Sequence, residues 1–341
     1  MHPQPPSPTP DRLGQGFSLV ELMVAMAIGL LLVAGVMAVV LNTQRSHREL
    51  NLASQRIESG HFALEQLGAE IHHAGFYGRF YDLSIPTTLP DPCSLDPAAL
   101  EQALGLPIQG YNDPPLSPLA CLAAGNHLPG TDILVIRRAT TTTTTPDLPA
   151  ARYIQSNPTD FVINKGEFDH TFHLTARDPA VPAPIRRFQV LIYFVSPCQI
   201  PTDGQVCDTT ADDGDPIPTL KRLELADDGT FRILPVAEGV EDLQLEYGLD
   251  GHGTGWPDRY LTPPMDPTDP AQWDPTHWAD VVAVRIHLLA RNVEPNHGYQ
   301  DQLVYDLGQA GDMGPFGDPY RRQLLQSTVR AINISSRRER P

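Results

Sequence analysis

The hydrophobic pattern changes abruptly near the N-terminus. After a polar, proline-rich stretch, the residues Gly16-Phe17-Ser18-Leu19-Val20-Glu21 lead directly into residues 22–41, which contain no charged side chain. Twenty helical residues rise about 30 Å, which is enough to cross the hydrocarbon core of a membrane. A carboxylate at the head of such a segment is costly to bury, so we expect Glu21 to have a partner. The pattern predicts a membrane-spanning helix with one functional acid at its start.

Behind this segment, the continuous apolar run gives way to a stripe. Apolar or small residues recur every seven positions in two rows, which are Leu50, Ile57, Leu64 and Ile71, and Ala53, Gly60, Leu67 and Ala74. This spacing predicts that the helix continues to about Ala74. The stripe fits an amphipathic helix on its own domain. It equally fits a helix that packs on a sheet and turns its other faces to neighbouring subunits.

The remaining chain predicts short strands separated by long loops. Prolines crowd residues 75–130, where we expect no continuous strand and only a short helix at 97–104 that Asp96 caps. Residues 140–145 are a threonine run that we expect to be a loop. Strands are predicted at 131–138, 161–163, 187–195, 220–226, 230–235, 240–247 and 281–290, with a closing strand at 320–334. Asp227-Asp228-Gly229 predicts a hairpin between two of these strands.

The strand at 240–247 alternates between apolar and polar residues. Leu243, Leu245 and Tyr247 share one face, and polar residues occupy the other. The strand at 281–290 alternates in the same way, which is typical of antiparallel strands with one face in the core and one in solvent. One long N-terminal helix followed by such strands predicts an α+β fold, in which the helix packs on an antiparallel sheet domain with loop-rich insertions.

Charge and cysteine content narrow the function classes. The net charge of −17, with only 24 Lys and Arg residues, argues against nucleic-acid binding as the main function. Six arginines near the end of the chain are interpreted as a solvated tail: Arg321, Arg322, Arg330, Arg337, Arg338 and Arg340. The four cysteines are Cys93, Cys121, Cys198 and Cys207, and an even number in an exported domain suggests two disulfides. Of the three possible pairings, we favour Cys93–Cys121 and Cys198–Cys207, which close local loops.

No local motif indicates catalysis or a cofactor. The chain has no Gly-x-Ser-x-Gly, no His-Glu-x-x-His and no phosphate-binding loop, so we expect neither an enzyme, a cofactor nor a metal centre. Two acidic loops leave calcium binding open, although solvated turns are favoured. They contain Asp208, Asp212, Asp213 and Asp215, and Asp250, His252 and Asp258.

The N-terminal motif resembles the class III signal of type IV prepilins. An ordinary secretory signal would have a shorter apolar run and a small-residue cleavage site, and a plain anchor would give no reason for Glu21. The resemblance implies that a prepilin peptidase cuts between Gly16 and Phe17, which makes Glu21 the fifth mature residue and an assembly residue. Three C-terminal phrases resemble the PilW group of minor pilins: GVEDLQLEYGLD at 239–250, VVAVRIHLLAR at 281–291 and RRQLLQSTVRAINI at 321–334. Residues 79–186 resemble no family.

The resemblance implies an organisation and a location. It divides the chain into a leader (1–16), a transmembrane half-helix (17–41), an amphipathic half-helix (42–75) and a periplasmic β-rich domain (76–341). The protein is then a single-pass inner-membrane protein that enters the pilus. The positive-inside rule favours the opposite orientation, because Asp11 cancels Arg12 while Arg45 and Arg48 follow the span. We give the four cysteines and the large polar domain more weight.

The implied function is structural. Such a minor pilin joins other minor pilins to prime type IV pilus assembly and lies near the pilus tip. Its implied partners are the other minor pilins, the major pilin, the prepilin peptidase, the inner-membrane assembly platform and a tip adhesin. Two alternatives stay open: a J-type pseudopilin of type II secretion, which would carry the same signal, and a membrane-anchored adhesin or binding module that grips its ligand with residues 79–186.

Overall fold

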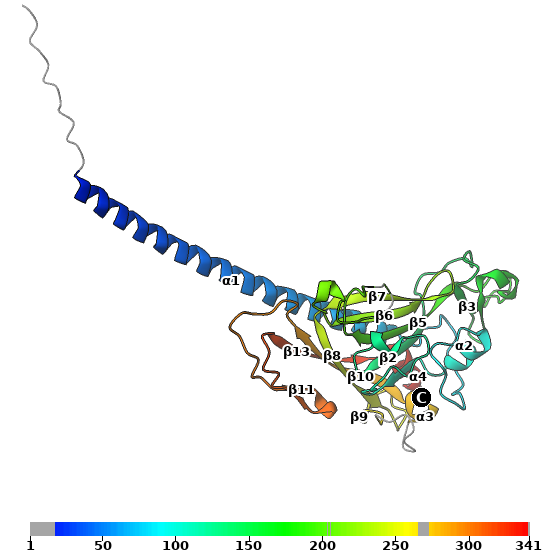
Figure 1. Cartoon of the computed structure of the whole chain (residues 1–341). Coiled ribbons are helices and arrows are strands. Elements are labelled where there is room, and N and C mark those ends of the chain that lie inside the picture. Colours follow the sequence, from blue (N-terminus) through cyan, green and yellow to red (C-terminus); the bar gives the residue numbers. More distant parts are fainter. Residues whose placement is uncertain (1–17, 203, 205, 265–272, 340–341) are drawn as a thin grey trace, which may run out of the picture. The chain divides into compact units, whose positions relative to one another are not determined.

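The computed structural model describes residues 18–202, 204, 206–264 and 273–339 (Figure 1). The first element is helix α1, Leu19–His73, and it is followed by antiparallel strands and short helices. The chain divides into two compact units, residues 1–51 and 52–341. The described part of the first unit is almost entirely the leading part of α1, and the second unit holds the trailing part and every strand. The predicted α+β class is confirmed.

Two large antiparallel sheets form the domain. The seven-stranded sheet has the order β1-β2-β5-β3-β4, with β6 paired to β5 and β7 paired to β6. Its strands are β1 Ile108–Tyr111, β2 Ile133–Ala139, β3 Arg152–Ser156, β4 Phe161–Lys165, β5 Ile185–Ser196, β6 Thr219–Leu225 and β7 Phe231–Glu238. The four-stranded sheet has the order β13-β10-β8-β9 and consists of β8 Val240–Leu249, β9 Arg259–Leu261, β10 Val281–Arg291 and β13 Arg322–Arg330.

Smaller elements connect and cover the sheets. They are helices α2 Pro97–Ala103, α3 Pro275–Ala279 and α4 Ile332–Arg338, the 3-10 turns η1 Ala124–Asn126, η2 Gly166–Thr171, η3 Asp212–Gly214 and η4 Gly308–Ala310, and the two-stranded pair β11 Tyr305–Asp306 and β12 Asp312–Met313. The predicted cap of α2 is confirmed, because Asp96 Oδ2 accepts from the Ala99 backbone N–H at 3.2 Å. The predicted hairpin is also confirmed as β6 and β7. Gly229 in its turn has φ +82°, a conformation that favours glycine.

The main core lies between the trailing part of α1 and both sheets. Ala63, Leu67 and Ile71 of the helix are fully buried in one cluster with Leu191, Tyr193 and Val195 of β5 and with apolar residues of β8, β10 and β13. Gly60 lets the helix approach β13 closely, because a Cβ added there would lie 2.8 Å from Leu325 Cδ1. The helix is therefore an integral part of the domain core from Leu52 onward.

The buried stripe of α1 differs from the predicted heptads. In the second predicted row Gly60, Leu67 and Ala74 are buried. In the first row Leu50 and Ile57 are 66% and 41% exposed. Ala63, outside both predicted rows, is fully buried. A straight α-helix has 3.6 residues per turn and drifts by about 20° per heptad relative to a seven-residue repeat, so one face of it cannot follow that repeat for long. The predicted first row is thus wrong over its first two members.

Residues 79–186 are called the middle region below. Part of this region covers one face of the seven-stranded sheet as a second layer. Alternate residues of β5, including Val190 and Phe194, point to a second core. Residues from 77 to 122 supply much of its cover, including Tyr77, Leu100, Leu104, Leu119 and Leu122. Residues 75–130, where no continuous strand was expected, contain one short strand that was not predicted, because β1 pairs with β2 between the flanking prolines. Strand β3 was not predicted, and it pairs with both β4 and β5.

The polar face of β8 and His287 on the polar face of β10 are buried, which corrects the sequence prediction. Asp242, Gln244 and Glu246 are at most 4% exposed, and His287 on β10 is also 4% exposed. Loops from distant parts of the chain cover them. Asp132 Oδ2 accepts from the Leu245 N–H at 2.7 Å, and Glu246 Oε1 accepts from the Gln309 N–H at 3.0 Å. A strand's own alternation carries no information about such long-range cover.

The end of the chain also differs from prediction. The closing strand stops at Arg330, where the Ala331 N–H donates to Val282 O, and helix α4 follows with Ile334 buried. The terminal arginines are not a solvated tail. Arg338 pairs with Asp280, Arg330 with Glu339, and Arg337 donates to Gly75 O. Arg340 lies outside the described residues.

Candidate interaction sites

The start of α1 presents Glu21 beside the predicted cleavage site. Ser18 precedes the helix, and its backbone N–H donates to Glu21 Oε2 at 3.0 Å. An acid that reaches back to the N-cap N–H is half of a capping box, and it also suits the positive end of the helix dipole. Gly16 and Phe17 lie outside the described residues. The spacing Ser-x-x-Glu could have identified Ser18 from the sequence.

The leading part of α1 is apolar and uncovered. An 18-residue window reaches a mean hydropathy of 2.8 with no residue buried, so the helix is long and apolar enough to cross a membrane. Leu31, for example, is 73% exposed. Exposed apolar surface of this extent marks a lipid or protein contact rather than a solvent-facing helix. Glu21 is the only charged residue between Leu19 and Leu41.

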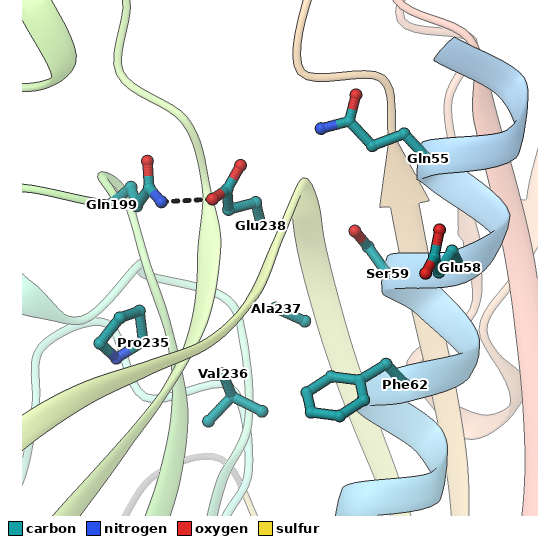
Figure 2. Close-up of a pocket in the computed structure, with 9 residues that line it drawn as sticks. All are labelled: Gln55, Glu58, Ser59, Phe62, Gln199, Pro235, Val236, Ala237 and Glu238. Carbon is teal, nitrogen blue, oxygen red and sulfur yellow. Dashed lines mark hydrogen bonds between the residues drawn. The ribbon is translucent and has the colours of Figure 1, made fainter. Parts of the chain in front are cut away.

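A groove lies between the trailing part of α1 and the edge strand β7 (Figure 2). It has a volume of about 450 Å³ and is lined by Gln55, Glu58, Ser59, Phe62, Gln199, Pro235, Val236, Ala237 and Glu238. Figure 2 shows the Phe62 ring turned toward Val236, and Phe62 remains 50% exposed. Because these residues come from three separate segments, no local sequence signal could have brought them together.

A more apolar groove lies against the layer formed by the middle region. It has a volume of about 340 Å³, and proline rings and aromatic side chains make up most of its walls. The lining residues are Leu89, Gln109, Gly110, Tyr111, Asn112, Pro114, Pro115, Leu116, Ser117, Pro118, Pro263, Pro264 and Trp278. Leu116 at its rim is 65% exposed. Apolar concave sites with a few polar groups are the usual form of ligand pockets.

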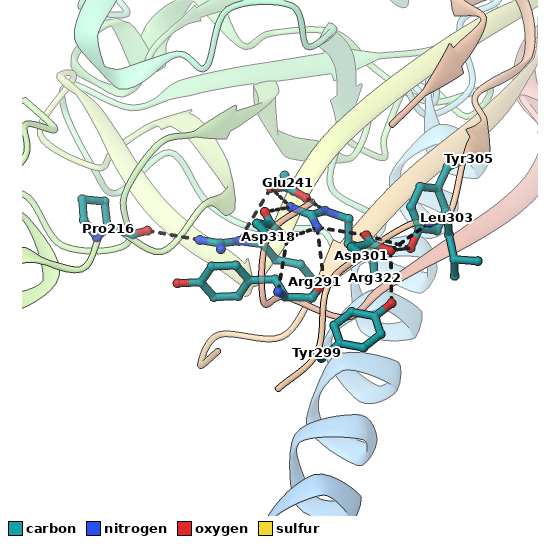
Figure 3. Close-up of polar contacts among 10 residues, drawn as sticks. Pro216, Glu241, Arg291, Tyr299, Asp301, Leu303, Tyr305, Asp318 and Arg322 are labelled. Atoms are coloured by element: carbon teal, nitrogen blue, oxygen red, sulfur yellow. Dashed lines mark hydrogen bonds and ion pairs between the residues drawn. The ribbon is translucent and has the colours of Figure 1, made fainter. Parts of the chain in front are cut away.

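A buried ionic network fixes the loop between β10 and β13 (Figure 3). The Arg322 side chain is 1% exposed and contacts Glu241, Asp301 and Asp318, with 3.0 Å between Arg322 Nη1 and Asp301 Oδ2. Burial alone would lower the pKa of the Arg322 guanidinium, but hydrogen bonds to Asp318 and Glu241 outweigh it and raise that pKa. Asp301 also accepts from the hydroxyls of Tyr299 and Tyr305. These ion pairs and hydrogen bonds hold the loop between β10 and β13 in place and have a structural role.

The cysteines form two bridges in the structure. Cys93 is joined to Cys121 and Cys198 to Cys207, with Cα atoms 5.5 and 5.6 Å apart. The first bridge lies within the middle region. The second closes the loop before Asp212, a carboxylate that accepts from the backbone N–H groups of Gln199, Ile200 and Ile217.

Carboxylates in the acidic loops accept hydrogen bonds from backbone N–H groups. Besides Asp212, Asp250 accepts from the N–H groups of Thr254 and Gly255, and Asp258 accepts from that of Gly251. Within the described part of the chain, no three His, Cys, Asp or Glu side chains are grouped to hold a metal ion. These loops therefore organise turns through their carboxylates.

Two family models match the chain. Residues 206–333 match the type IV pilus-assembly protein W family, and residues 12–37 match the prokaryotic N-terminal methylation motif. The first match covers β6–β8, β10 and β13, and the second covers the candidate cleavage site with Glu21. No curated protein and no solved structure matches the chain. The two matches, together with the long apolar helix and the antiparallel sheets behind it, support a type IV pilus minor pilin of the PilW type with a class III prepilin signal.

Proposed function

We propose that this minor pilin joins other minor pilins to prime pilus assembly and lies near the pilus tip. The observation that carries the proposal is the uncovered leading part of α1, whose one charged residue is Glu21. No residue from Leu22 to Leu41 is buried, and the surface is apolar, so lipid and neighbouring pilin helices are the partners that it fits.

Glu21 is proposed to pair with the amine that processing creates on Phe17. Cleavage after Gly16 would expose this amine, which is cationic near neutral pH. The Glu21 carboxylate already bonds the N–H of the next residue, Ser18, so it lies within reach of a charge on Phe17 of its own chain or of a neighbour. At a membrane boundary an unpaired carboxylate costs at least about 2 kcal/mol, and pairing with a positive charge offsets that cost.

Processing is the first requirement of the proposal. With prepilin peptidase present, the mature protein is expected to begin at Phe17, and Gly16→Ala should be cut more readily than Gly16→Leu. N-terminal sequencing measures both. An intact Met1, or a cut beyond Leu41, would contradict the class III interpretation.

The partner class is decided by crosslinking in intact membranes followed by purification through this chain. We expect other minor pilins and the major pilin, with the domain on the periplasmic side. Recovery of type II secretion components in their place would show a J-type pseudopilin. A domain that is digested only by protease added from the cytoplasmic side would contradict the orientation.

One observation favours a second candidate function, a binding module. The middle region supplies most of the apolar groove that contains Tyr111 and Trp278. Leu116→Asp would place a charge at its exposed rim without disturbing the core. A loss of cell adhesion at an unchanged number of pili would support ligand binding there, and unchanged adhesion would count against it.

A further inference from the structure

Strand β13 is an outer strand of the four-stranded sheet, and β10 is its one partner among the described strands. In an antiparallel pair, residues alternate between those that exchange both backbone hydrogen bonds and those that exchange none. At one end of this ladder the Asn292 N–H donates to Arg321 O. At the other end the Ala331 N–H donates to Val282 O, in the same register. The odd-numbered residues of β13 therefore bond to β10, and the N–H and C=O groups of the even-numbered residues point away from the sheet.

These outward groups are unpaired within the part of the chain that the structure describes. No hydrogen bond between described residues reaches the backbone N–H or C=O of Leu324, Gln326 or Thr328. Gln326 and Thr328 are also exposed. The outer edge of β13 thus offers half of a β-ladder, which an extended segment of another chain could complete.

The other sheet edges are protected in ways that β13 is not. Natural edge strands avoid unwanted pairing by being short or by carrying a proline, a charge or a bulge. Strands β1, β4 and β9 have four, five and three residues. Strand β7 is longer but contains Pro235, and its register with β6 is shifted between Leu220 and Lys221. Strand β13 has nine residues, no proline and an unbroken register with β10, so its edge is long, regular and open.

Apolar side chains border this edge. Leu64 lies on the face of α1 that packs on β13, and both Leu64 and Val329 are only partly buried. At the end of the strand, the Arg330 guanidinium lies 4.1 Å from the centre of the Trp256 ring, and Trp256 is 60% exposed. Tryptophan and arginine are enriched in protein–protein interfaces. The surroundings of the edge therefore suit a protein partner.

The direction of α1 argues against symmetric pairing with a second copy. A Cβ added at Gly60 would lie 2.8 Å from Leu325 Cδ1, and one at Gly68 would lie 3.5 Å from Val329 Cγ2. Eight helical residues rise about 12 Å and four strand residues about 13 Å, so the trailing part of α1 runs beside β13 in the same direction. Two β13 strands paired antiparallel would make their helices run in opposite directions. Chains anchored in one membrane by the N-terminal parts of these helices cannot do this.

We propose that the outer edge of β13 pairs with an extended strand of a different minor pilin, so that one sheet continues across the two subunits. Main-chain hydrogen bonds from Leu324, Gln326 and Thr328 supply the contact, and Trp256 packs at its end. The inference rests on the proposed function, because it names the surface through which this chain joins another minor pilin.

Photo-crosslinking of the intact chain in its own membranes identifies the occupant. The photoreactive amino acid p-benzoylphenylalanine is placed at Thr328 and, as a control, at exposed Arg232 on edge strand β7. We expect the probe at Thr328 to capture a chain that carries its own prepilin signal and differs from this one, and the probe at Arg232 not to capture it. Capture of a second copy of this chain, or of no pilin, would overturn the proposal.

A proline variant tests the backbone contact itself. Thr328→Pro removes an N–H that points away from β10, so the sheet keeps its internal ladder and Tm should stay close to that of the wild type. Recovery of the captured pilin from crosslinked membranes should fall at least about tenfold, because a carbonyl of the partner loses its donor. Thr328→Val, which keeps the N–H, should recover the partner normally.

The two roles of the chain fail separately. Normal recovery with Thr328→Pro and a loss with Glu21→Ala would overturn pairing at this edge and leave the proposed function standing. Hydrogen exchange gives a readout that needs no variant. In the purified chain the amides of Leu324, Gln326 and Thr328 should exchange rapidly, and they should become protected when the captured pilin is bound. Equal exchange in the free and bound chain would contradict strand pairing.

Discussion

The leading and trailing parts of α1 belong to one helix but have opposite environments. Between Leu19 and Leu41 no residue is buried, whereas from Leu52 onward one face is enclosed by both sheets. The trailing part carries polar residues on its remaining faces, as a helix on a globular domain does. The leading part is apolar on all faces, as a helix in lipid or among other helices is. The trailing part therefore stabilises the domain. Under the proposed function, the leading part is the surface that serves assembly.

The strongest way to break this comparison is to truncate one leucine in each part. Leu67 is fully buried, so Leu67→Ala should lower the free energy of unfolding of the domain by about 2–5 kcal/mol through lost contacts and a cavity. Leu31 is 73% exposed, and Leu31→Ala should leave domain unfolding unchanged. Chemical denaturation in detergent, followed by tryptophan fluorescence, measures both. An equal loss of unfolding free energy in the two variants would show that the leading part also stabilises the domain.

The pH dependence of stability should likewise come from the domain. Burial raises the pKa of the Asp242 carboxyl to about 7 in the folded state. Between about pH 4 and pH 7 this carboxyl is therefore protonated in the folded chain but ionised in the unfolded chain. Stability therefore falls as pH rises from about 4 to about 7, by at most about 4 kcal/mol for this group, and is constant above that range. Asp242→Asn should reduce this slope. A slope as steep as that of the wild type would show that other groups cause it.

Removing either disulfide should lower the stability of the domain by a smaller amount and leave the leading part of α1 unaffected. Cys93–Cys121 closes a loop with a sequence separation of 28 and Cys198–Cys207 one with a separation of 9. Replacing both cysteines of a pair by serine should cost roughly 2–4 kcal/mol, with the larger loss for the longer loop. Non-reducing peptide mapping of the exported protein checks the pairing first. Free thiols or crossed pairs would contradict it, and the helicity of the leading part should not change in either variant.

The sequence predicted those features that depend on neighbouring residues. The apolar span, the Asp96 cap, the hairpin turn and most strands follow from local pattern, and all are present. Features that depend on distant segments were missed or wrong. The polar face of β8 is buried by residues near 131 and 309, and Arg322 finds acids from three parts of the chain. The start of the predicted stripe failed because a straight helix follows a period of 3.6 rather than 3.5.

The candidate sites divide in the same way. Glu21 was singled out from the sequence because it is the acid at the head of an uncharged apolar run, a pattern that needs no long-range contact. The groove at Phe62 and the apolar groove at Tyr111 each join segments far apart in the chain. Strand pairing and loop cover must be known before such residues can be placed together.

The central claim is that the leading part of α1 serves assembly while the domain folds without its help, and Glu21→Ala tests it most directly. The measurement is the recovery of other minor pilins with this chain from crosslinked membranes, with Glu49→Ala as a control that removes an exposed carboxylate from the same helix beyond the span. We predict that Glu21→Ala is processed, inserted and as stable as the wild type but recovers far fewer partners, whereas Glu49→Ala recovers them normally. Equal recovery for Glu21→Ala with normal piliation would contradict the account.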